Sequence, residues 1–179
     1  MVVEINIPAL LSPRKLFQAG LILGGIVLGF WPGPASADTD TGLAYMKDHD
    51  YVKALKELIP AAESGDVRAQ TNLGSIYYYG LGIPMNFEKA FRWYHAAALQ
   101  GELNAQIGLA IMYIKGQQVQ PDPTIAYMWL TLAMDQMPAG NDNDRVSANR
   151  DYLSSQMTAG ELRKATDRVQ TWYQTHQAP

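Results

Sequence analysis

Alanine, leucine and aromatic residues recur in the middle of the chain at spacings that follow one face of a helix. One segment carries alanine, leucine and tyrosine at relative positions 0, 4 and 8, and the next carries alanine, tryptophan and alanine at positions 0, 3 and 7. Both spacings bring their residues to a single helix face. The residues are Ala69, Leu73 and Tyr77 in the first segment and Ala90, Trp93 and Ala97 in the second. The pattern predicts two helices, and no strand pattern competes with it.

The same pattern returns thirty-six residues later, almost entirely at small, aromatic or aliphatic positions. The residues Ala69, Gln70, Leu73, Tyr77, Gly80, Ile83, Ala90, Trp93, Ala97 and Gly101 are matched by Ala105, Gln106, Leu109, Tyr113, Gly116, Val119, Ala126, Trp129, Ala133 and Met137. Helices that stack need such residues where they touch, whereas catalytic residues have no reason to recur. A half-unit precedes the repeat, with Ala54, Leu58, Ala61, Ala62 and Gly65 one period before Ala90, Tyr94, Ala97, Ala98 and Gly101. We therefore expect an all-α stack of three helical hairpins, over residues 42–65, 66–101 and 102–137.

The segments between the predicted helices carry turn and cap residues. Gly80 and Gly82 can leave a helix through a left-handed conformation, and Pro84 cannot continue one. Asn86 and Asp122 stand just before the second helix of their hairpins. A side-chain oxygen at that place can accept a hydrogen bond from backbone amides that otherwise lack a partner. These signals favour the hairpin interpretation.

At these positions the sequence resembles the Sel1-like repeat, a relative of the tetratricopeptide repeat. The resemblance is carried by Ala69-Gln70, Leu73-Gly74, Tyr77, Gly80-Leu81-Gly82-Ile83, Lys89-Ala90, Trp93-Tyr94, Ala97-Ala98 and Gly101. The first hairpin is instead similar to a tetratricopeptide unit, through Gly42, Tyr45, Asp50-Tyr51 and Ala54. The departures from the Sel1-like pattern are mild: Asn86 replaces the usual aspartate, Ala110 replaces a glycine, and Gln117-Gln118 replaces the small-residue turn.

The resemblance implies a right-handed superhelix of helix pairs that holds other proteins on its concave surface. It carries over no catalytic residue. Similar proteins of bacterial envelopes commonly act as adaptors or regulators of surface polysaccharide, motility or envelope assembly. A protein partner is therefore expected, although the sequence does not identify it.

The N-terminus has the pattern of a secretory signal peptide. Arg14 and Lys15 precede an uncharged run of sixteen residues, from Leu16 to Trp31, which contains four glycines. The run is shorter than the roughly 20 apolar residues that a membrane-spanning helix needs, and 35–37 (Ala-Ser-Ala) fits a cleavage site. We expect residues 1–37 to be removed and residues 38–179 to act in the periplasm. The alternative is an uncleaved membrane anchor.

Composition removes several classes of function. The chain has no cysteine, which excludes disulfides, thiol catalysis and cysteine-bound metal. Without Glu4, Arg14 and Lys15 it carries 12 basic and 16 acidic residues, with no basic stripe for nucleic acid. The part after residue 37 also lacks a basic amphipathic helix, so no direct membrane contact is expected after cleavage. We expect no cofactor.

Sharper chemical interpretations are weaker than structural ones. The three histidines have no second ligand at a suitable spacing, so a metal site is not expected. The acidic cluster at 142–144 lacks the glycine and the distal glutamate of a helix-loop-helix calcium site. Glu57 and Glu63 could be imagined as a carboxylate pair for glycan hydrolysis, but nothing apolar nearby would raise the pKa of one of them. We therefore expect no catalytic residues.

Residues 138–179 predict a helix pair that caps the end of the stack. A polar loop is expected around residues 141–144, followed by a helix with Val146, Leu153 and Met157 on one face. The sequence from Thr158 to Glu161 forms a capping-box pattern, and it opens a last amphipathic helix. Its apolar residues are Leu162, Ala165, Val169 and Trp172. A cap is needed because a terminal repeat otherwise exposes its apolar face.

The first helix of each repeat carries the candidate partner-binding surface. Thr71, Ser75 and Tyr78 lie at helical spacing on a face other than that of Tyr77, and resemblance to tetratricopeptide units places this face on the concave side. Their period-mates are isoleucines. The predicted partner-binding residues are Arg68, Thr71, Ser75, Tyr78, Tyr79, Asn104, Ile107, Ile111, Ile114 and Lys115. Either the three isoleucines form an open groove wall, or the C-terminal helices cover them.

These observations predict an exported, non-catalytic protein-binding scaffold or regulator. Two alternatives stay open at this point. One is a structural subunit of a larger envelope machine, whose apolar surface is never free. The other is a hydrolase of cell-wall or surface glycan, which would need a cleft with paired carboxylates.

Overall fold

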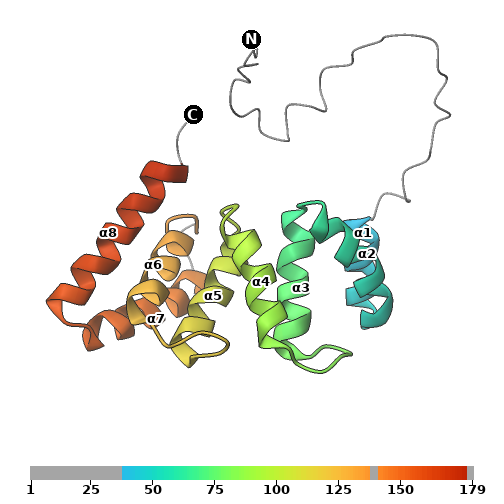
Figure 1. The fold of residues 1–179 in the computed structure, drawn as a ribbon, viewed down its shortest axis with the longest axis horizontal. Helices are drawn as coiled ribbons and strands as arrows, with labels where there is room; N and C mark the ends of the chain where they lie inside the picture. The colour runs from blue at the N-terminus through green and yellow to red at the C-terminus, as the bar shows by residue number, and fades with distance from the viewer. Residues whose placement is uncertain (1–37, 138–140, 177–179) are drawn as a thin grey trace, which may run out of the picture. The chain divides into compact units, whose positions relative to one another are not determined.

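The computed structural model describes residues 38–137 and 141–176, which form eight α-helices packed as stacked hairpins (Figure 1). The helices are α1 (Thr39–Lys47), α2 (Tyr51–Glu63), α3 (Val67–Tyr79), α4 (Phe87–Ala98), α5 (Leu103–Lys115), α6 (Pro123–Met134), α7 (Asn141–Gln156) and α8 (Ala159–His176). The predicted all-α fold is confirmed. The proposed signal peptide, residues 1–37, lies outside the described residues.

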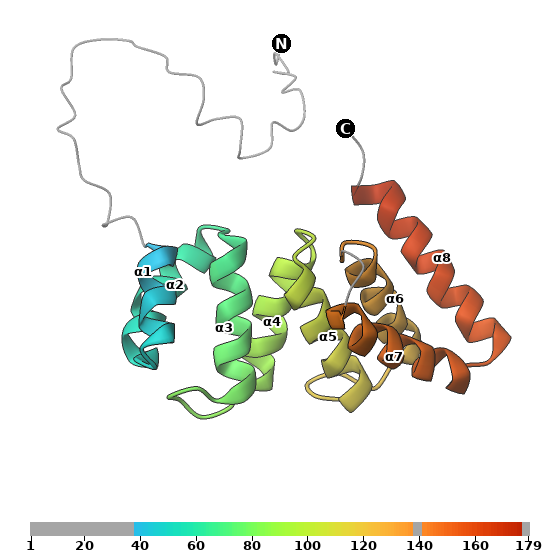
Figure 2. The same ribbon diagram turned by 180° about the vertical axis from the view of Figure 1, so that it is seen from behind.

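Each hairpin packs against the next one along the chain. The helices pair as α1 with α2, α3 with α4, and α5 with α6, while α2 also packs on α3 and α4 on α5. Both α7 and α8 pack against α6, which closes the C-terminal end of the stack (Figure 2). The core therefore runs from one hairpin to the next instead of gathering in one centre.

Local capping explains where the helices of the hairpins begin and end. Asn86 accepts a hydrogen bond from the backbone N–H of Lys89 at 2.9 Å, and Asp122 accepts from the N–H of Thr124 at 2.8 Å. Gly80 and Gly116 end α3 and α5 in the left-handed conformation, at φ of 65° and 66°. The predicted caps Asn86 and Asp122 and the left-handed exit at Gly80 are confirmed.

The two equivalent tryptophans differ in burial. Trp129 is buried, as the sequence pattern predicts, but Trp93 is only half-buried. The repeat pattern places both tryptophans where stacked helices touch and so predicts that both are buried, which is wrong for Trp93. The difference arises because Trp172 of α8 covers Trp129, with their ring centroids 5.1 Å apart.

The C-terminal pair differs from expectation at its start. Residues 141–144 belong to α7, so the predicted polar loop at this place is wrong. Asparagine and aspartate suit the first turn of a helix, where backbone N–H groups are free and the helix dipole favours negative charge. The predicted capping box is confirmed, since Glu161 accepts from the backbone N–H of Thr158 and donates its own N–H to the Thr158 hydroxyl. Ala165 and Val169 are buried, as predicted for one face of α8.

Candidate functional site: a groove between α3 and α5

A groove of about 480 Å³ lies between α3 and α5, the first helices of the two repeats. Seven of the ten predicted partner-binding residues line this α3–α5 groove: Arg68, Thr71, Ser75, Tyr79, Asn104, Ile107 and Ile111. Asn72, Glu102 and Gly108 complete the lining. The groove has a mainly polar wall from α3 and a more apolar wall from α5, as the sequence comparison of the two helices suggests.

The ring of Tyr94, from α4, lies between the two groove helices. A Cβ atom on Gly74 of α3 would lie 2.5 Å from Cδ1 of Tyr94, and one on Gly108 of α5 would lie 3.0 Å from Cε2. Both positions therefore need the missing side chain of glycine to admit the ring. The Tyr94 hydroxyl lies 3.0 Å from Oγ of Ser75. Burial raises the pKa of Tyr94 to about 12, so this hydroxyl is neutral at physiological pH.

Glu102 connects the N-terminus of α5 to α3. Its Oε2 accepts from the backbone N–H of Ala105 at 2.7 Å and lies 3.1 Å from Oγ1 of Thr71. Its Oε1 accepts from the side-chain amide of Asn104 at 3.2 Å. A carboxylate cap satisfies a free helix N–H and also interacts favourably with the helix dipole. Glu102 thus fixes the spacing of the two walls, a role that the sequence analysis missed because cap position alone does not reveal a contact with another repeat.

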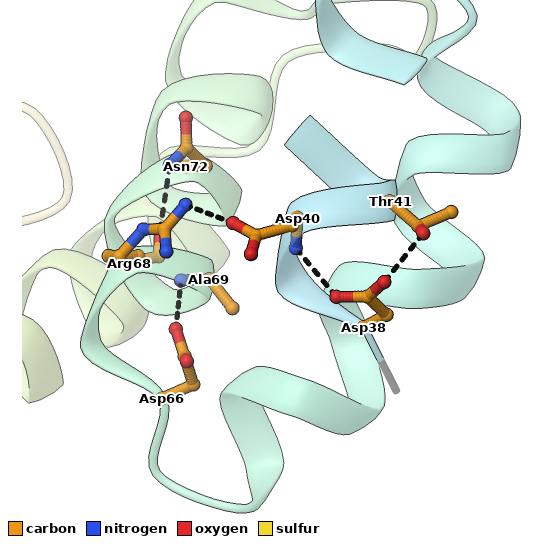
Figure 3. A network of polar contacts seen from close by, with 7 residues as sticks. All are labelled: Asp38, Asp40, Thr41, Asp66, Arg68, Ala69 and Asn72. Atoms are coloured by element: carbon orange, nitrogen blue, oxygen red, sulfur yellow. Dashed lines mark hydrogen bonds and ion pairs between the residues drawn. The ribbon is translucent and has the colours of Figure 1, made fainter. Parts of the chain in front are cut away.

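The end of the groove nearest α1 is held by Arg68. Its guanidinium donates to Asp40 of α1 at 2.6 Å, and its backbone carbonyl accepts from the side-chain amide of Asn72 at 2.7 Å (Figure 3). Figure 3 also shows Asp38 and Asp66 capping α1 and α3 on either side of this contact. Both members of the ion pair are exposed, so the pair adds little stability. Its effect is to direct Arg68 toward α1.

Two predicted partner-binding residues are buried in the fold. Tyr78, expected to be free at the surface, is only 8% exposed because it packs against Phe87 and Tyr94. Its hydroxyl accepts from Nζ of Lys115 at 3.2 Å, so Lys115 contacts the core residue and does not line the groove. Thr71 is also buried, with Oγ1 2.9 Å from the carbonyl of Val67. The expectation that Tyr78 and Thr71 are open surface residues is wrong, whereas Tyr79 is 62% exposed.

Ile107, Ile111 and Ile114, which we call the isoleucine stripe, are neither fully open nor fully covered. Ile107 and Ile111 are half-buried, and Ile114, outside the groove lining, is 39% exposed. On the side away from α3, Ile107 and Ile111 line a second cavity of about 330 Å³ together with Val146 of α7. Helix α7 therefore borders the stripe. The other C-terminal helix, α8, places the indole of Trp172 on Trp129 instead.

The groove contains little that suggests chemistry. Glu102 is the one carboxylate in its lining, and it is already bound as a helix cap. The described residues bring together no group of three histidine, aspartate or glutamate side chains that could bind a metal ion. Among the helices of residues 38–137 and 141–176, none combines the length and apolarity needed to cross a membrane.

Comparison with known sequences identifies the repeats. The model of the Sel1 repeat matches residues 67–102 and 103–136. Chitin synthase regulatory factor 4 of Schizosaccharomyces pombe is 31% identical over 126 residues, covering 69% of this chain and 18% of that protein. An F-box protein of Arabidopsis thaliana is 33% identical over 98 residues, covering 55% of this chain and 27% of its own length. The chain thus spans less than a third of either relative.

Solved structures share the same arrangement of helices. A protective antigen of uropathogenic Escherichia coli with an SLR fold superposes with a TM-score of 0.70 at 28% identity, covering 81% of this chain and 31% of that one. A Sel1 repeat protein from Oxalobacter formigenes superposes with a TM-score of 0.60 at 28% identity, covering 76% of this chain and 54% of that one. Repeat pattern, helix order and structural likeness agree, and the chain is a Sel1-like repeat protein.

Proposed function

We propose that this protein is an exported, non-catalytic adaptor that holds a segment of a partner protein in the α3–α5 groove. Sel1-like and tetratricopeptide-like repeats generally mediate protein binding, so the family supports a scaffold. The observation that carries the proposal is the groove itself, which combines a polar wall on α3 with isoleucines on α5. Its one carboxylate is occupied by Ala105, Asn104 and Thr71, which leaves the lining without a pair for acid and base catalysis.

The lining indicates the chemistry of the partner segment. Ile107 and Ile111 offer apolar area for one or two aliphatic side chains. At the opposite wall, on α3, the Asn72 side-chain amide and the Ser75 hydroxyl can form hydrogen bonds with a peptide backbone, and Asn104 adds a further amide in the first turn of α5. The partner is therefore a segment with apolar side chains along one edge and accessible backbone groups along the other.

Export is the second part of the proposal. The basic residues, the short uncharged run and the small residues at 35–37 have the pattern of a cleaved signal peptide. Asp38 caps α1 through the N–H of Asp40 at 3.0 Å, so the first described helix begins directly after the proposed cleavage site. Periplasmic fractionation and N-terminal sequencing test this step. A membrane-bound species that retains residues 16–31 would contradict cleavage.

Affinity capture from bacterial envelope extract tests the groove. The bait proteins are the parent, two groove variants, Tyr79→Ala and Asn104→Ala, and the control Arg163→Ala. Each of the three substitutions is at an exposed side chain. A partner held in the groove is retained by the parent and by Arg163→Ala, and it is lost or reduced with the two groove variants. Equal capture by all four proteins would place the partner elsewhere. Turnover of a glycan by the purified protein would contradict the non-catalytic assignment.

A further inference from the structure

The second helices of the two repeats carry equivalent tryptophans in different surroundings. Trp129 on α6 is 4% exposed and packs edge to face with Trp172 of the C-terminal helix α8. Trp93 on α4, one period earlier, is half-buried and lines a pocket of about 240 Å³. We call this the Trp93 pocket. Its lining is Ile59 and Glu63 from α2, Tyr77 from α3, and Lys89, Arg92 and Trp93 from α4.

The rim of the Trp93 pocket differs from the same positions in the second repeat. Lys89 and Arg92 stand where the second repeat has Ile125 and Met128, and Glu63, in the preceding hairpin, stands where the first repeat has Leu99. Near Trp129 the rim is apolar, and α8 of the same chain packs there. Around Trp93 the rim is charged, and the lining comes only from helices of its own and the preceding hairpin. Both places thus have a tryptophan at the base, but the surrounding side chains are charged at Trp93 and apolar at Trp129.

The two basic side chains of this rim have no carboxylate partner in the described part of the chain. Neither Lys89 nor Arg92 forms an ion pair with a carboxylate among the side chains of residues 38–137 and 145–176. Lys89 Nζ lies 5.0 Å from the ring centroid of Tyr77, which holds the ammonium beside the aromatic floor. Two cations face one carboxylate, Glu63, in a chain whose net charge is −3. The pocket is therefore locally basic on an acidic protein.

We infer that the Trp93 pocket is a second docking site, which takes an acidic segment of a partner protein and receives one aromatic side chain of that segment against Trp93. The packing of Trp172 on Trp129 shows within the same chain that an aromatic ring fits the equivalent position. The rim cations supply the charge complementarity for aspartate or glutamate beside that ring. An aromatic side chain in a pocket with charged residues at its rim is the usual composition of a binding hot spot.

This site is separate from the α3–α5 groove. Tyr77, which lies in the Trp93 pocket, is two residues after Ser75, which lies in the groove. At about 100° per residue the two side chains leave α3 roughly 200° apart, on opposite sides of the helix. The inference therefore stands independently of the proposed function, and a partner could occupy both surfaces at once.

Nuclear magnetic resonance of the indole N–H groups in the purified, full-length protein tests the inference. The probe is a synthetic peptide, acetyl-Glu-Asp-Phe-Glu-Asp-amide, and a Trp93→Phe variant assigns the Trp93 signal. We expect a saturable shift of the Trp93 indole signal, with the signals of Trp129 and Trp172 unchanged. A peptide with alanine in place of phenylalanine and one with lysine in place of each acidic residue should bind at least about tenfold more weakly.

Charge variants provide the second measurement. Lys89→Glu and Arg92→Glu should each weaken the acidic peptide about tenfold or more, because both side chains are exposed and line the pocket. Arg163→Glu, an exposed change on α8 outside this lining, should leave the affinity unchanged. No shift at Trp93 up to about 10 mM peptide, or equal binding of the lysine peptide, would overturn the site. Equal binding of the alanine peptide would reduce it to a site for anions and overturn the aromatic docking.

Discussion

Trp129 and Trp172 pack edge to face, with ring centroids 5.1 Å apart and an interplanar angle of 70°. The contact joins the last helix of the second repeat, α6, to the last helix of the described chain, α8. Trp129 is almost fully buried, whereas Trp172 is half-buried. The pair therefore determines both how the second repeat is closed and why its tryptophan is better enclosed than Trp93.

Trp129→Ala should destabilise the protein by about 3–5 kcal/mol, because removal of a large buried aromatic side chain leaves a cavity. Denaturant unfolding measures this loss. Trp93→Ala is the matched change in the other repeat and should cost clearly less, since Trp93 is already half-exposed. A loss within about 0.5 kcal/mol for Trp129→Ala, the range of a surface substitution, would show that this face of α6 is not core.

Gly74→Ala should destabilise the protein by about 1–3 kcal/mol, although alanine is the better helix former. The new Cβ would lie 2.5 Å from the Tyr94 ring, so the ring or the helix must move. Thermal or denaturant unfolding checks the change. Gly160→Ala, in the first turn of α8, is the control: its Cβ would have only the Thr158 hydroxyl nearby, at 3.9 Å, and the substitution should be neutral or stabilising. Equal effects of both substitutions would contradict the close approach of Tyr94.

The sequence alone predicted the repeated helices and several of their ends, because these depend on local signals. Alanine spacing marks the packed face, and Asn86 and Asp122 act on amides two or three residues away. The family resemblance, which rested on the same residues, is confirmed by the Sel1 repeat model over residues 67–102 and 103–136. Such features need no knowledge of what lies across the stack.

Contacts between repeats were harder to predict. The burial of Tyr78 depends on Phe87 and Tyr94 and on Lys115, which is thirty-seven residues away in the chain. The repeat pattern marks Tyr77 as core by its match to Tyr113 but offers no such match for Tyr78. The glycines at 74 and 108 were a usable signal, since a glycine inside a helix often marks a close approach of another group. The sequence shows the glycines but not that Tyr94 fills the space.

Tyr94 should make the stability depend on pH between about 10 and 12. Its pKa is raised from 10.0 to about 12, chiefly by burial, so in this range the unfolded protein loses a proton that the folded protein keeps. The contribution of Tyr94 is fully present below pH 10 and is lost as pH rises through 12. Between about pH 9 and 11.5, the unfolding free energy of Tyr94→Phe should fall less than that of the parent. At neutral pH the variant should be less stable by about 0.5–1.5 kcal/mol, because it lacks the hydrogen bond between Tyr94 and Ser75. Burial also raises the pKa of Tyr113 and of Tyr173, but both titrate in the parent and in Tyr94→Phe, so their effects cancel in the comparison. An identical fall in the two proteins would count against Tyr94 as the cause.

Thr71→Asp should be destabilising by about 1–3 kcal/mol, because the new carboxylate would lie beside Glu102 in a buried place. Lowering the pH from 7 to about 4 should reduce the loss, since protonation of the new carboxyl relieves the repulsion. Thr71→Val keeps the shape without the charge and should cost less at pH 7. Unfolding free energies at the two pH values check both variants. A loss for Thr71→Asp that does not change with pH would indicate that repulsion from Glu102 is not its cause.

Ile111→Asp should abolish partner capture at a moderate cost in stability. The side chain lines the α3–α5 groove, so a carboxylate there removes apolar contact area where the partner segment docks. Because Ile111 is half-buried beside α7, the charge keeps some contact with water, and we expect a loss of about 1–2 kcal/mol instead of the several expected for full burial. Ile114→Asp adds the same charge one turn later, outside the lining, and should leave capture and melting temperature near those of the parent. Retention of the partner by a folded Ile111→Asp protein would exclude the groove as the binding site. A large fall in the melting temperature of this variant would instead mean that α7 covers Ile111 and does not only lie beside it.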